Sequence, residues 1–477
     1  MEAEVQRAKP GEILGSKKGR KWRCWVFTGC VILILVGIGV GIAVASGDPG
    51  GRKDGHDKNS APPSTAPTQF YTPPPVPDFG LDLKLPEAST GSWTILGSSQ
   101  PLKNNGGGRF GTVVGLNFQG TRIAVSAPAN AVHGQNAGQV VIYQLDQQDS
   151  TWKMMGEPIY GTVMSRAGDS IAFSGLGEVV AIGAPIETSS IGVNKAGRVR
   201  VFRWNGTHWP QMGKVLEGDQ VGEEFGSSLS LNAKGSRLAT GSWNKYEGGN
   251  ASVGEARLYD FNKDNEEWEQ KGSSLTGKHA NDQFARSIAL SASGDRIAIG
   301  APGAGSPDDR TVSDPGLVSV FDLHQGEWYQ YGHTISGLTT RAGAGLRLSL
   351  SGDGLRLAVL QGTSQQVVVY ESKSTGWKQV GQILEVKAMA SSELSLSFEG
   401  NRIAVSGGVD GHEEIGQVKV YDYNYQSDLW LVLGDPITSV EAGVNDNTGS
   451  SVALAASGYI IAVGADLGAG SARILEF

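Results

Sequence analysis

The residues best suited to contact a ligand are aromatic and acidic side chains in irregular, loop-like stretches of the chain. Aromatic side chains offer a flat apolar face with a polar edge, and carboxylates bind cationic groups. Loops that vary on a rigid scaffold are the usual place for recognition. Packing within the loop and solvated loop charge are the alternatives. The candidate ligand contacts are Trp243, Tyr246, Asp308, Asp309, Glu413 and Glu414.

Patterns typical of catalysis or metal binding are not evident. The seven histidines lack the paired spacing of metal ligands, and no Gly-x-Ser-x-Gly motif occurs. We therefore expect no enzyme activity, catalytic residue, metal or cofactor. A site assembled from several repeats stays open as the alternative, in particular a hydrolase or lyase acting on extracellular glycan.

The elements that must position the candidates form an internal repeat. A Trp followed four residues later by Gly recurs at intervals of 49 to 60 residues, and an apolar-Ala pair follows a Gly-containing turn equally often. The tryptophans are Trp93, Trp152, Trp209, Trp268, Trp328, Trp377 and Trp430. The pairs begin at Ile123, Val180, Leu238, Ile297, Leu357, Ile403 and Ile461. We interpret the tryptophans as packing between repeats.

Four segments with a period of two residues, repeated seven times, predict an all-β, seven-bladed β-propeller over residues 91–477. The array starts with the fourth segment alone, at Trp93 to Gly97, and stops with the third, at Phe477. We therefore expect the first strand to complete the last blade in a 3+1 closure, which leaves no unpaired edge there.

Several repeats resemble FG-GAP repeats, the blade units of the integrin α-chain headpiece. The resemblance rests on Phe110-Gly111, Phe225-Gly226, Gly183-Ala-Pro185 and Gly300-Ala-Pro302. It implies an extracellular propeller that serves binding and adhesion. WD-type repeats are a weaker match, because no Trp-Asp dipeptide occurs and the period exceeds the usual ~40–45 residues.

The calcium sites of the FG-GAP family need an Asp-rich insert between the first and second strands, since Ca²⁺ takes six to eight oxygen ligands. The corresponding connections here are tight turns such as Asn232-Ala-Lys-Gly235. We expect no calcium site of that type.

An uncharged apolar segment precedes the repeats. Residues 25–46 are long enough to cross a membrane as one helix, and the basic residues before them favour a cytosolic N-terminus. We expect a type II signal anchor in the plasma membrane or an endomembrane, with the propeller extracellular or lumenal. A signal peptide cleaved near Ala43-Val-Ala45 stays open as the alternative. Gly37, Gly41 and Ala45 form a small-residue ridge that could support a homodimer.

The segments flanking the anchor differ in composition from the repeats. Residues 1–24 form a basic cytosolic tail, and residues 47–90 are a Pro/Gly/Ser-rich stretch that we expect to be a disordered stalk. The formal net charge of −8 argues against a nucleic-acid partner. Two sequons, at Asn205 and Asn250, predict a glycoprotein if the propeller is lumenal.

These observations together predict a non-catalytic binding or adhesion propeller on a membrane anchor. In a propeller, the connections between second and third strands lie on one face, and here they are the long and variable ones. We expect this face to recognise an extracellular protein or glycan. A structural protein of a cell wall or matrix is a further alternative.

Overall fold

The computed structural model describes residues 91–97, 100–103, 107–305, 314–387, 392–409, 412–439 and 445–477. These residues form strands and turns, and no helix among them is long and apolar enough to span a membrane. The expected tail, membrane segment and stalk, including Gly37, Gly41 and Ala45, lie outside the described residues.

The strands form seven separate antiparallel sheets, and each sheet is one blade. The innermost strands are β2 (Val114–Leu116), β7 (Ser170–Phe173), β11 (Ser228–Leu231), β16 (Ser287–Leu290), β21 (Ala344–Leu350), β26 (Leu394–Leu396) and β31 (Thr448–Leu454). The second strands are β3 (Arg122–Ala127), β8 (Val179–Ala184), β12 (Arg237–Ser242), β17 (Arg296–Ala301), β22 (Arg356–Gln361), β27 (Arg402–Val409) and β32 (Ile460–Ala465).

The third strands are β4 (Gln139–Asp146), β9 (Arg198–Arg203), β13 (Glu255–Asn262), β18 (Leu317–His324), β23 (Gln366–Lys373), β28 (His412–Asn424) and β33 (Ser471–Glu476). The outer strands are β5 (Thr151–Met154), β14 (Glu267–Gln270), β19 (Glu327–Gln330), β24 (Gly376–Gln379), β29 (Leu429–Val432) and, for the last blade, β1 (Thr94–Ile95). Two-residue strands also pair with the third strand: β6 (Ile159–Tyr160), β10 (Leu216–Glu217), β15 (Leu275–Thr276), β20 (Ile335–Ser336), β25 (Leu384–Glu385) and β30 (Ile437–Thr438).

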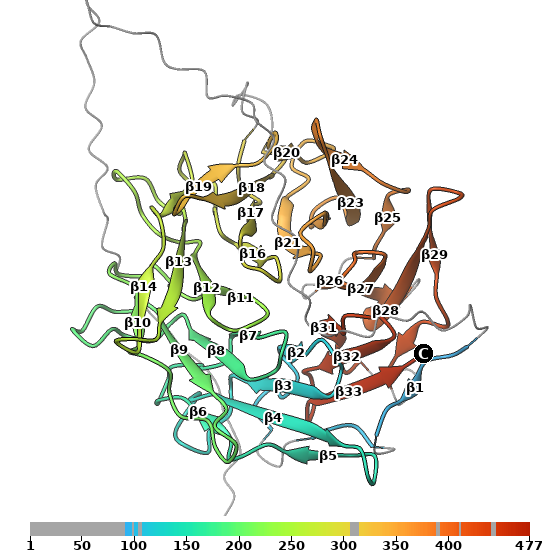
Figure 1. The fold of residues 1–477 in the computed structure, drawn as a ribbon, viewed down its shortest axis with the longest axis horizontal. Coiled ribbons are helices and arrows are strands. Elements are labelled where there is room, and N and C mark those ends of the chain that lie inside the picture. The colour runs from blue at the N-terminus through green and yellow to red at the C-terminus, as the bar shows by residue number, and fades with distance from the viewer. Residues whose placement is uncertain are drawn as a thin grey trace, which may run out of the picture. The chain divides into compact units, whose positions relative to one another are not determined.

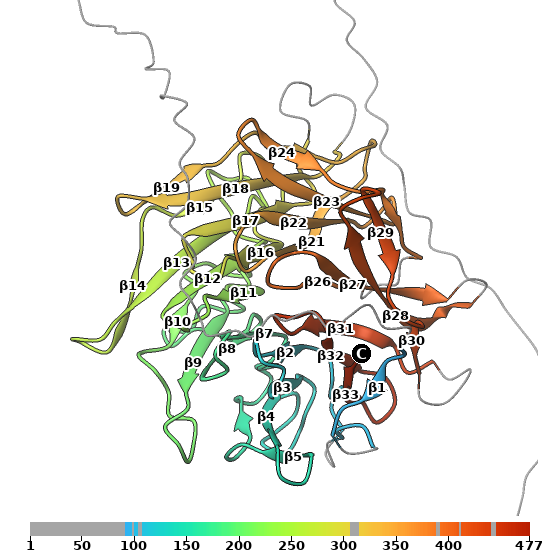
Figure 2. The same ribbon diagram turned by 45° about the vertical axis from the view of Figure 1, so that its right-hand side comes forward.

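The blades form a closed ring. Each innermost strand contacts the innermost strands of the two neighbouring blades, and β2 contacts β31, so the first blade meets the seventh. Figures 1 and 2 show the blades following one another around this ring. The seven-bladed all-β architecture predicted from the repeat is therefore confirmed.

The ring closes by the expected strand. β1 pairs antiparallel with β33, with Thr94 opposite Glu476 and Ile95 opposite Leu475. Trp93 packs on Phe477 with ring centroids 5.2 Å apart. The last blade thus combines the two ends of the propeller, as predicted.

The core lies between the blades and centres on the second strands. Both members of every apolar-Ala pair are completely buried, because a central strand is covered on both faces by neighbouring blades. The pairs are Ile123/Ala124, Val180/Ala181, Leu238/Ala239, Ile297/Ala298, Leu357/Ala358, Ile403/Ala404 and Ile461/Ala462.

The repeated tryptophans link adjacent blades through their indole N–H groups. Six of the seven donate to the carbonyl that precedes the repeated Gly of the blade before. The pairs are Trp152–Leu96, Trp209–Met155, Trp268–Met212, Trp328–Lys271, Trp430–Val380 and Trp93–Leu433, at 2.7–3.1 Å. The seventh, Trp377, is buried, and its Nε1 has no hydrogen-bond partner among the described residues.

Candidate functional site

The two faces of the ring differ in their connections. Turns between first and second strands are short, and they form what we call the short-turn face. The opposite, long-loop face carries the connections between second and third strands. These are long in the first four blades and short in the fifth, where β22 ends at Gln361 and β23 begins at Gln366.

At the centre of the short-turn face, hydrogen bonds join the turns of neighbouring blades. Backbone N–H groups donate around the ring from each first-to-second turn to the turn of the next blade, and Ala456 N to Phe118 O, at 2.9 Å, joins the last blade to the first. The rings of Phe118 and Phe398 meet edge to face, with centroids 5.3 Å apart. A ligand at the ring centre would therefore approach from the long-loop face.

Charged and aromatic side chains gather at the centre of that long-loop face. Five of them stand at or just before the innermost strands of five different blades, and the sixth, Trp243, follows β12. We call this set the central cluster: Asp169, Glu224, Trp243, Arg286, Arg347 and Glu393. Glu224 and Arg286 both contact Trp243, Arg347 forms an ion pair with Glu393, and the charges of these groups shift one another's pKa values.

Trp243 connects the third and fourth blades. Its Nε1 donates to Glu224 Oε2 at 3.1 Å, and the guanidinium of Arg286 lies 5.1 Å from its ring centre. Burial raises the pKa of Glu224, and the charge of Asp169 raises it further. Burial and the charge of Arg347 lower the pKa of Arg286. The Arg286 guanidinium makes no hydrogen bond to a described residue, and the charges of Glu224 and Glu393 act on it.

A second pair lies beside it. Arg347 and Glu393 form an ion pair, with 29% and 26% of their side-chain surfaces exposed. Burial raises the pKa of Glu393, and that of Asp169 is raised in the same way although Arg166 binds its carboxylate at 2.8 Å. Carboxylates with raised pKa values beside a cation with a lowered one are typical of functional sites.

Backbone strain recurs next to the central cluster. In five blades the residue before the Phe-Gly position has a positive φ without being glycine, and such strain is retained where the surroundings enforce it, often at functional sites. The five are Arg109, Arg166, Glu224, Gln283 and Asn447, with φ between 53° and 62°. The long loop of the preceding blade holds several of them, as in Arg166 N to Asn136 O and Gln283 N to Ser252 O, both at 2.9 Å.

A buried ion network holds the long loop of the third blade. Lys245, in this loop, binds Glu255 at 2.9 Å and Asp219 at 3.1 Å, and Arg257 binds Glu255 at 2.8 Å and Glu223 at 3.2 Å. Breaking one member of such a network leaves a buried charge without a partner, which is costly. The loop therefore presents its exposed residues from a fixed base.

The candidate ligand contacts predicted from the sequence lie in different environments in the structure. Trp243 is half-buried in the central cluster, whereas Tyr246 is 45% exposed on the same loop. Asp308 and Asp309 lie outside the described residues. The expectation that Glu413 and Glu414 lie in a loop was wrong: β27 and β28 continue as a hairpin past Gly408, which pairs with Gly416, so both residues belong to β28.

Both sequons lie among the described residues. Asn205 and Asn250 are both exposed. Asn205 starts a tight turn after the third strand of the second blade, and its Oδ1 accepts hydrogen bonds from the backbone N–H groups of Thr207 and His208 at 3.0 Å. No group of three or more His, Cys, Asp or Glu side chains arranged for a metal ion occurs among the described residues.

Comparison with known proteins is informative about the fold. No protein-family model and no curated protein matches the sequence. Among solved structures, the β-propeller domain of Cps50 (Swd1) from Myceliophteria thermophila is similar, with a TM-score of 0.50 and 11% identity over 81% of this chain and 99% of that one. Hydrazine synthase from Kuenenia stuttgartiensis has a TM-score of 0.49 at 12% identity, over 80% of this chain and 98% of that one. At such identities these likenesses show the fold alone.

The expectation that the chain has no enzyme activity was wrong, because it excluded enzymes altogether. The structures similar to it include the periplasmic gluconolactonase PpgL of Pseudomonas aeruginosa, at 15% identity and a TM-score of 0.46, over 70% of this chain and 94% of that one. This finding overturns the exclusion, and at this similarity it assigns no activity.

The central cluster could not be found from the sequence. Its members look like ordinary strand-flanking residues, and they are separated by up to 224 positions, from Asp169 to Glu393. One signal was present: the polar residue that flanks the Phe-Gly position changes from blade to blade while its neighbours repeat.

Proposed function

We propose that this chain is a recognition propeller that binds an extracellular or lumenal protein or glycan on its long-loop face, with the central cluster at the middle of the contact. Display on a type II membrane anchor, residues 25–46, belongs to the same proposal. The resemblance to FG-GAP repeats supports a function in adhesion.

The observation that carries this proposal is the arrangement around Arg286. Its guanidinium lies over the Trp243 ring, makes no hydrogen bond to a described residue and is flanked by a second cation, Arg347. An acidic group on the ligand would relieve the repulsion between the two cations and gain charge-assisted hydrogen bonds. Tyr246 extends the contact surface outward.

The remaining acidic residues support an acidic rather than a basic ligand group. Glu223 is neutralised by Arg257, and Asp282 accepts from the backbone N–H groups of Lys278 and His279 at 2.9 Å. Because these carboxylates are already paired or hydrogen-bonded, they offer little to a cationic partner.

The test is a binding screen with the full-length chain in detergent against glycans and secreted proteins. R286A and W243A should each lose at least tenfold in affinity, while R286K retains part of it. K234A is the matched control, because Lys234 lies in a turn on the short-turn face. Unchanged binding by R286A and W243A would place the site elsewhere.

A second candidate function is a hydrolase or lyase acting on extracellular glycan. The observation that favours it is the pair Asp169 and Glu224, because burial raises the pKa of both carboxyls and so favours the protonated form that a general acid needs. Release of new reducing ends from polysaccharide by the unaltered chain, abolished by E224Q and D169N, would favour this candidate over pure binding.

A further inference from the structure

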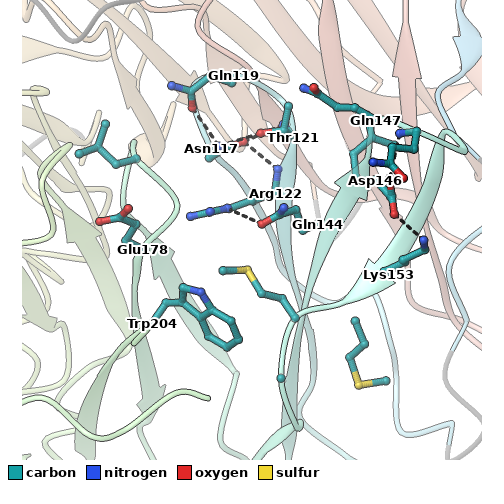
Figure 3. Close-up of a pocket in the computed structure, with 16 residues that line it drawn as sticks. Asn117, Gln119, Thr121, Arg122, Gln144, Asp146, Gln147, Lys153, Glu178 and Trp204 are labelled. Atoms are coloured by element: carbon teal, nitrogen blue, oxygen red, sulfur yellow. Dashed lines mark hydrogen bonds and ion pairs between the residues drawn. The ribbon is translucent and has the colours of Figure 1, made fainter. Parts of the chain in front are cut away.

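A polar groove lies between the first and second blades, on the short-turn side and away from the central cluster. Its volume is about 920 Å³, against about 380 Å³ for the corresponding groove between the third and fourth blades. Ligand sites commonly have volumes of about 300–1,000 Å³. In Figure 3, Arg122 lies between Gln144 and Glu178, and Trp204 stands on the wall that the second blade contributes.

Arg122 belongs to a set of five arginines that join neighbouring blades. Each sits at the start of a second strand and donates its Nη1 to a turn carbonyl of the next blade, at 2.8–3.1 Å. The pairs are Arg122–Gly177, Arg237–Gly294, Arg296–Gly354, Arg356–Gly400 and Arg402–Ser457.

Arg122 is the member of this set that forms no ion pair with a described residue. Arg237 binds Asp260 and Asp295, both at 2.6 Å. The other three arginines each form an ion pair and lie under a tyrosine ring at 3.5–4.5 Å: Arg296 with Asp322 and Tyr331, Arg356 with Glu371 and Tyr423, and Arg402 with Asp422 and Tyr459.

Arg122 has neither kind of partner among the described residues. Its Nε donates at 3.1 Å to Gln144, a neutral amide at the position that Asp260, Asp322, Glu371 and Asp422 occupy in the other blades. Nη2 makes no hydrogen bond to a described residue. The face that a tyrosine covers in three blades opens here into the groove.

Apart from Glu178 and the ion pair between Asp146 and Lys153, the rest of the lining suits hydroxyl groups and a sugar ring. Gln119, Gln144, Gln147 and Gln148 expose side-chain amides, which both donate and accept hydrogen bonds as sugar hydroxyls do. Trp204 is half-buried and supplies a flat surface for the apolar face of a pyranose. A peptide would need apolar pockets or an extended backbone partner, and the exposed lining is predominantly polar.

We propose that this groove binds an oligosaccharide that carries carboxylate groups, with the carboxylate on Arg122, a pyranose ring on Trp204 and the glutamine amides on its hydroxyls. The site is independent of the one proposed on the long-loop face. In the blades of Arg296, Arg356 and Arg402, a carboxylate and a tyrosine ring occupy the corresponding space around the arginine.

The experiment measures binding of tetragalacturonate by calorimetry to the full-length chain carrying N205Q, so that a glycan beside Trp204 cannot occupy the groove. We expect saturable binding, and at least tenfold weaker binding of the fully methyl-esterified tetramer. R122Q and W204A should each weaken binding at least tenfold, R122K less. E178Q should strengthen it, since it removes the carboxylate opposite Arg122.

The matched control is K234A, which changes the corresponding groove between the third and fourth blades and should bind normally. Thermal unfolding midpoints show whether each variant is folded, and E178Q gives a gain that misfolding cannot produce. Absence of binding, equal binding of the methyl ester, or equal binding by R122Q and R122K would overturn the proposal. Tighter binding of tetraglutamate, which presents carboxylates without a sugar ring, would show that the ligand is an acidic peptide and not a glycan. R286A should leave this binding unchanged, so failure here and failure of the proposed function are distinguishable.

Discussion

Trp93 donates its indole N–H to the carbonyl of Leu433 at 3.0 Å, across 340 positions of sequence. This bond joins the strand that closes the ring to the outer edge of the sixth blade. The next link, Trp152 to Leu96 at 2.9 Å, joins the same strand to the first blade. The closing strand is therefore held from both sides.

Replacing Trp93 by Ala should destabilise the whole ring. The change removes the hydrogen bond to Leu433 and the packing on Phe477, and we expect a loss of about 2–4 kcal/mol in the free energy of unfolding. Denaturant unfolding followed by fluorescence and circular dichroism should still give coincident transitions. Separate transitions, with one blade lost first, would contradict a ring that unfolds as a unit.

Trp377 and Trp430 provide a matched pair. Both are buried at the same repeat position, but Nε1 of Trp430 donates to Val380 O at 3.1 Å, whereas Nε1 of Trp377 has no hydrogen-bond partner in the part of the chain that the structure describes. W430F should lower the free energy of unfolding by about 1 kcal/mol more than W377F does. W430F removes a donor that forms a hydrogen bond, whereas W377F removes a buried donor that forms none. Equal losses in the free energy of unfolding would contradict the difference in hydrogen bonding.

The repeated glycines leave room for these tryptophans. A Cβ on Gly381 would overlap Cδ1 of Trp430, and its φ of +69° is unfavourable for Ala. Gly192 has a φ of +86° with nothing within 4 Å of the added Cβ, so G192A should cost only the backbone term of about 1–2 kcal/mol. We expect G381A to lower the free energy of unfolding, measured with denaturant, by more than G192A does. Equal losses would show that the contact between residue 381 and Trp430 is unimportant for stability.

The central cluster should make stability depend on pH. Burial raises the pKa of Glu224 above the ordinary carboxyl range near about 4, so the folded state holds this proton more tightly than the unfolded state does. The resulting stability is present at low pH and is lost as pH rises through the raised pKa. As the pH rises above the ordinary carboxyl range near about 4, the E224Q variant should therefore lose less stability than the unaltered chain.

The control for this prediction is E269Q, at a surface carboxylate. Hydrogen bonds from Asn265 and Asn262 lower the pKa of Glu269, so its contribution is present at higher pH and is lost as pH falls through the lowered value. Free energies of unfolding measured from pH 3 to 8 should separate the two variants. The same slope for E224Q and the unaltered chain would argue against a raised pKa at Glu224.

The two sequons test the proposed placement of the propeller. Both asparagines are exposed, and N-glycosylation requires the lumen of the secretory pathway. In a eukaryotic host we expect N205Q and N250Q each to remove one glycan from the mass, with the double variant insensitive to an N-glycosidase. A chain with no glycan at either site would speak against a lumenal propeller.

The count and closure of the blades were predictable because each blade repeats the same local pattern. Gly turns, strand alternation and the apolar-Ala pairs are local, and a pair such as Ile297/Ala298 is apolar because both faces of its strand are covered. The two truncated ends also complement one another, which predicts that the strand after Trp93 joins the one before Phe477. Strand pairing in register then follows from the period of two residues.

Only the tertiary structure decided which side chains meet between blades. Asp169, Glu224 and Arg286 are brought together because the ring places the starts of distant strands at one centre. The hairpin that includes Glu413 and Glu414 depends on pairing past Gly408, which loop length did not reveal. Likewise, Arg122 and Arg296 look alike in sequence, and only their neighbours differ: Asp322 and Tyr331 neutralise and cover one, while the other opens into a groove. Local periodicity determines strands and their order, whereas charge compensation depends on contacts between residues far apart in the chain.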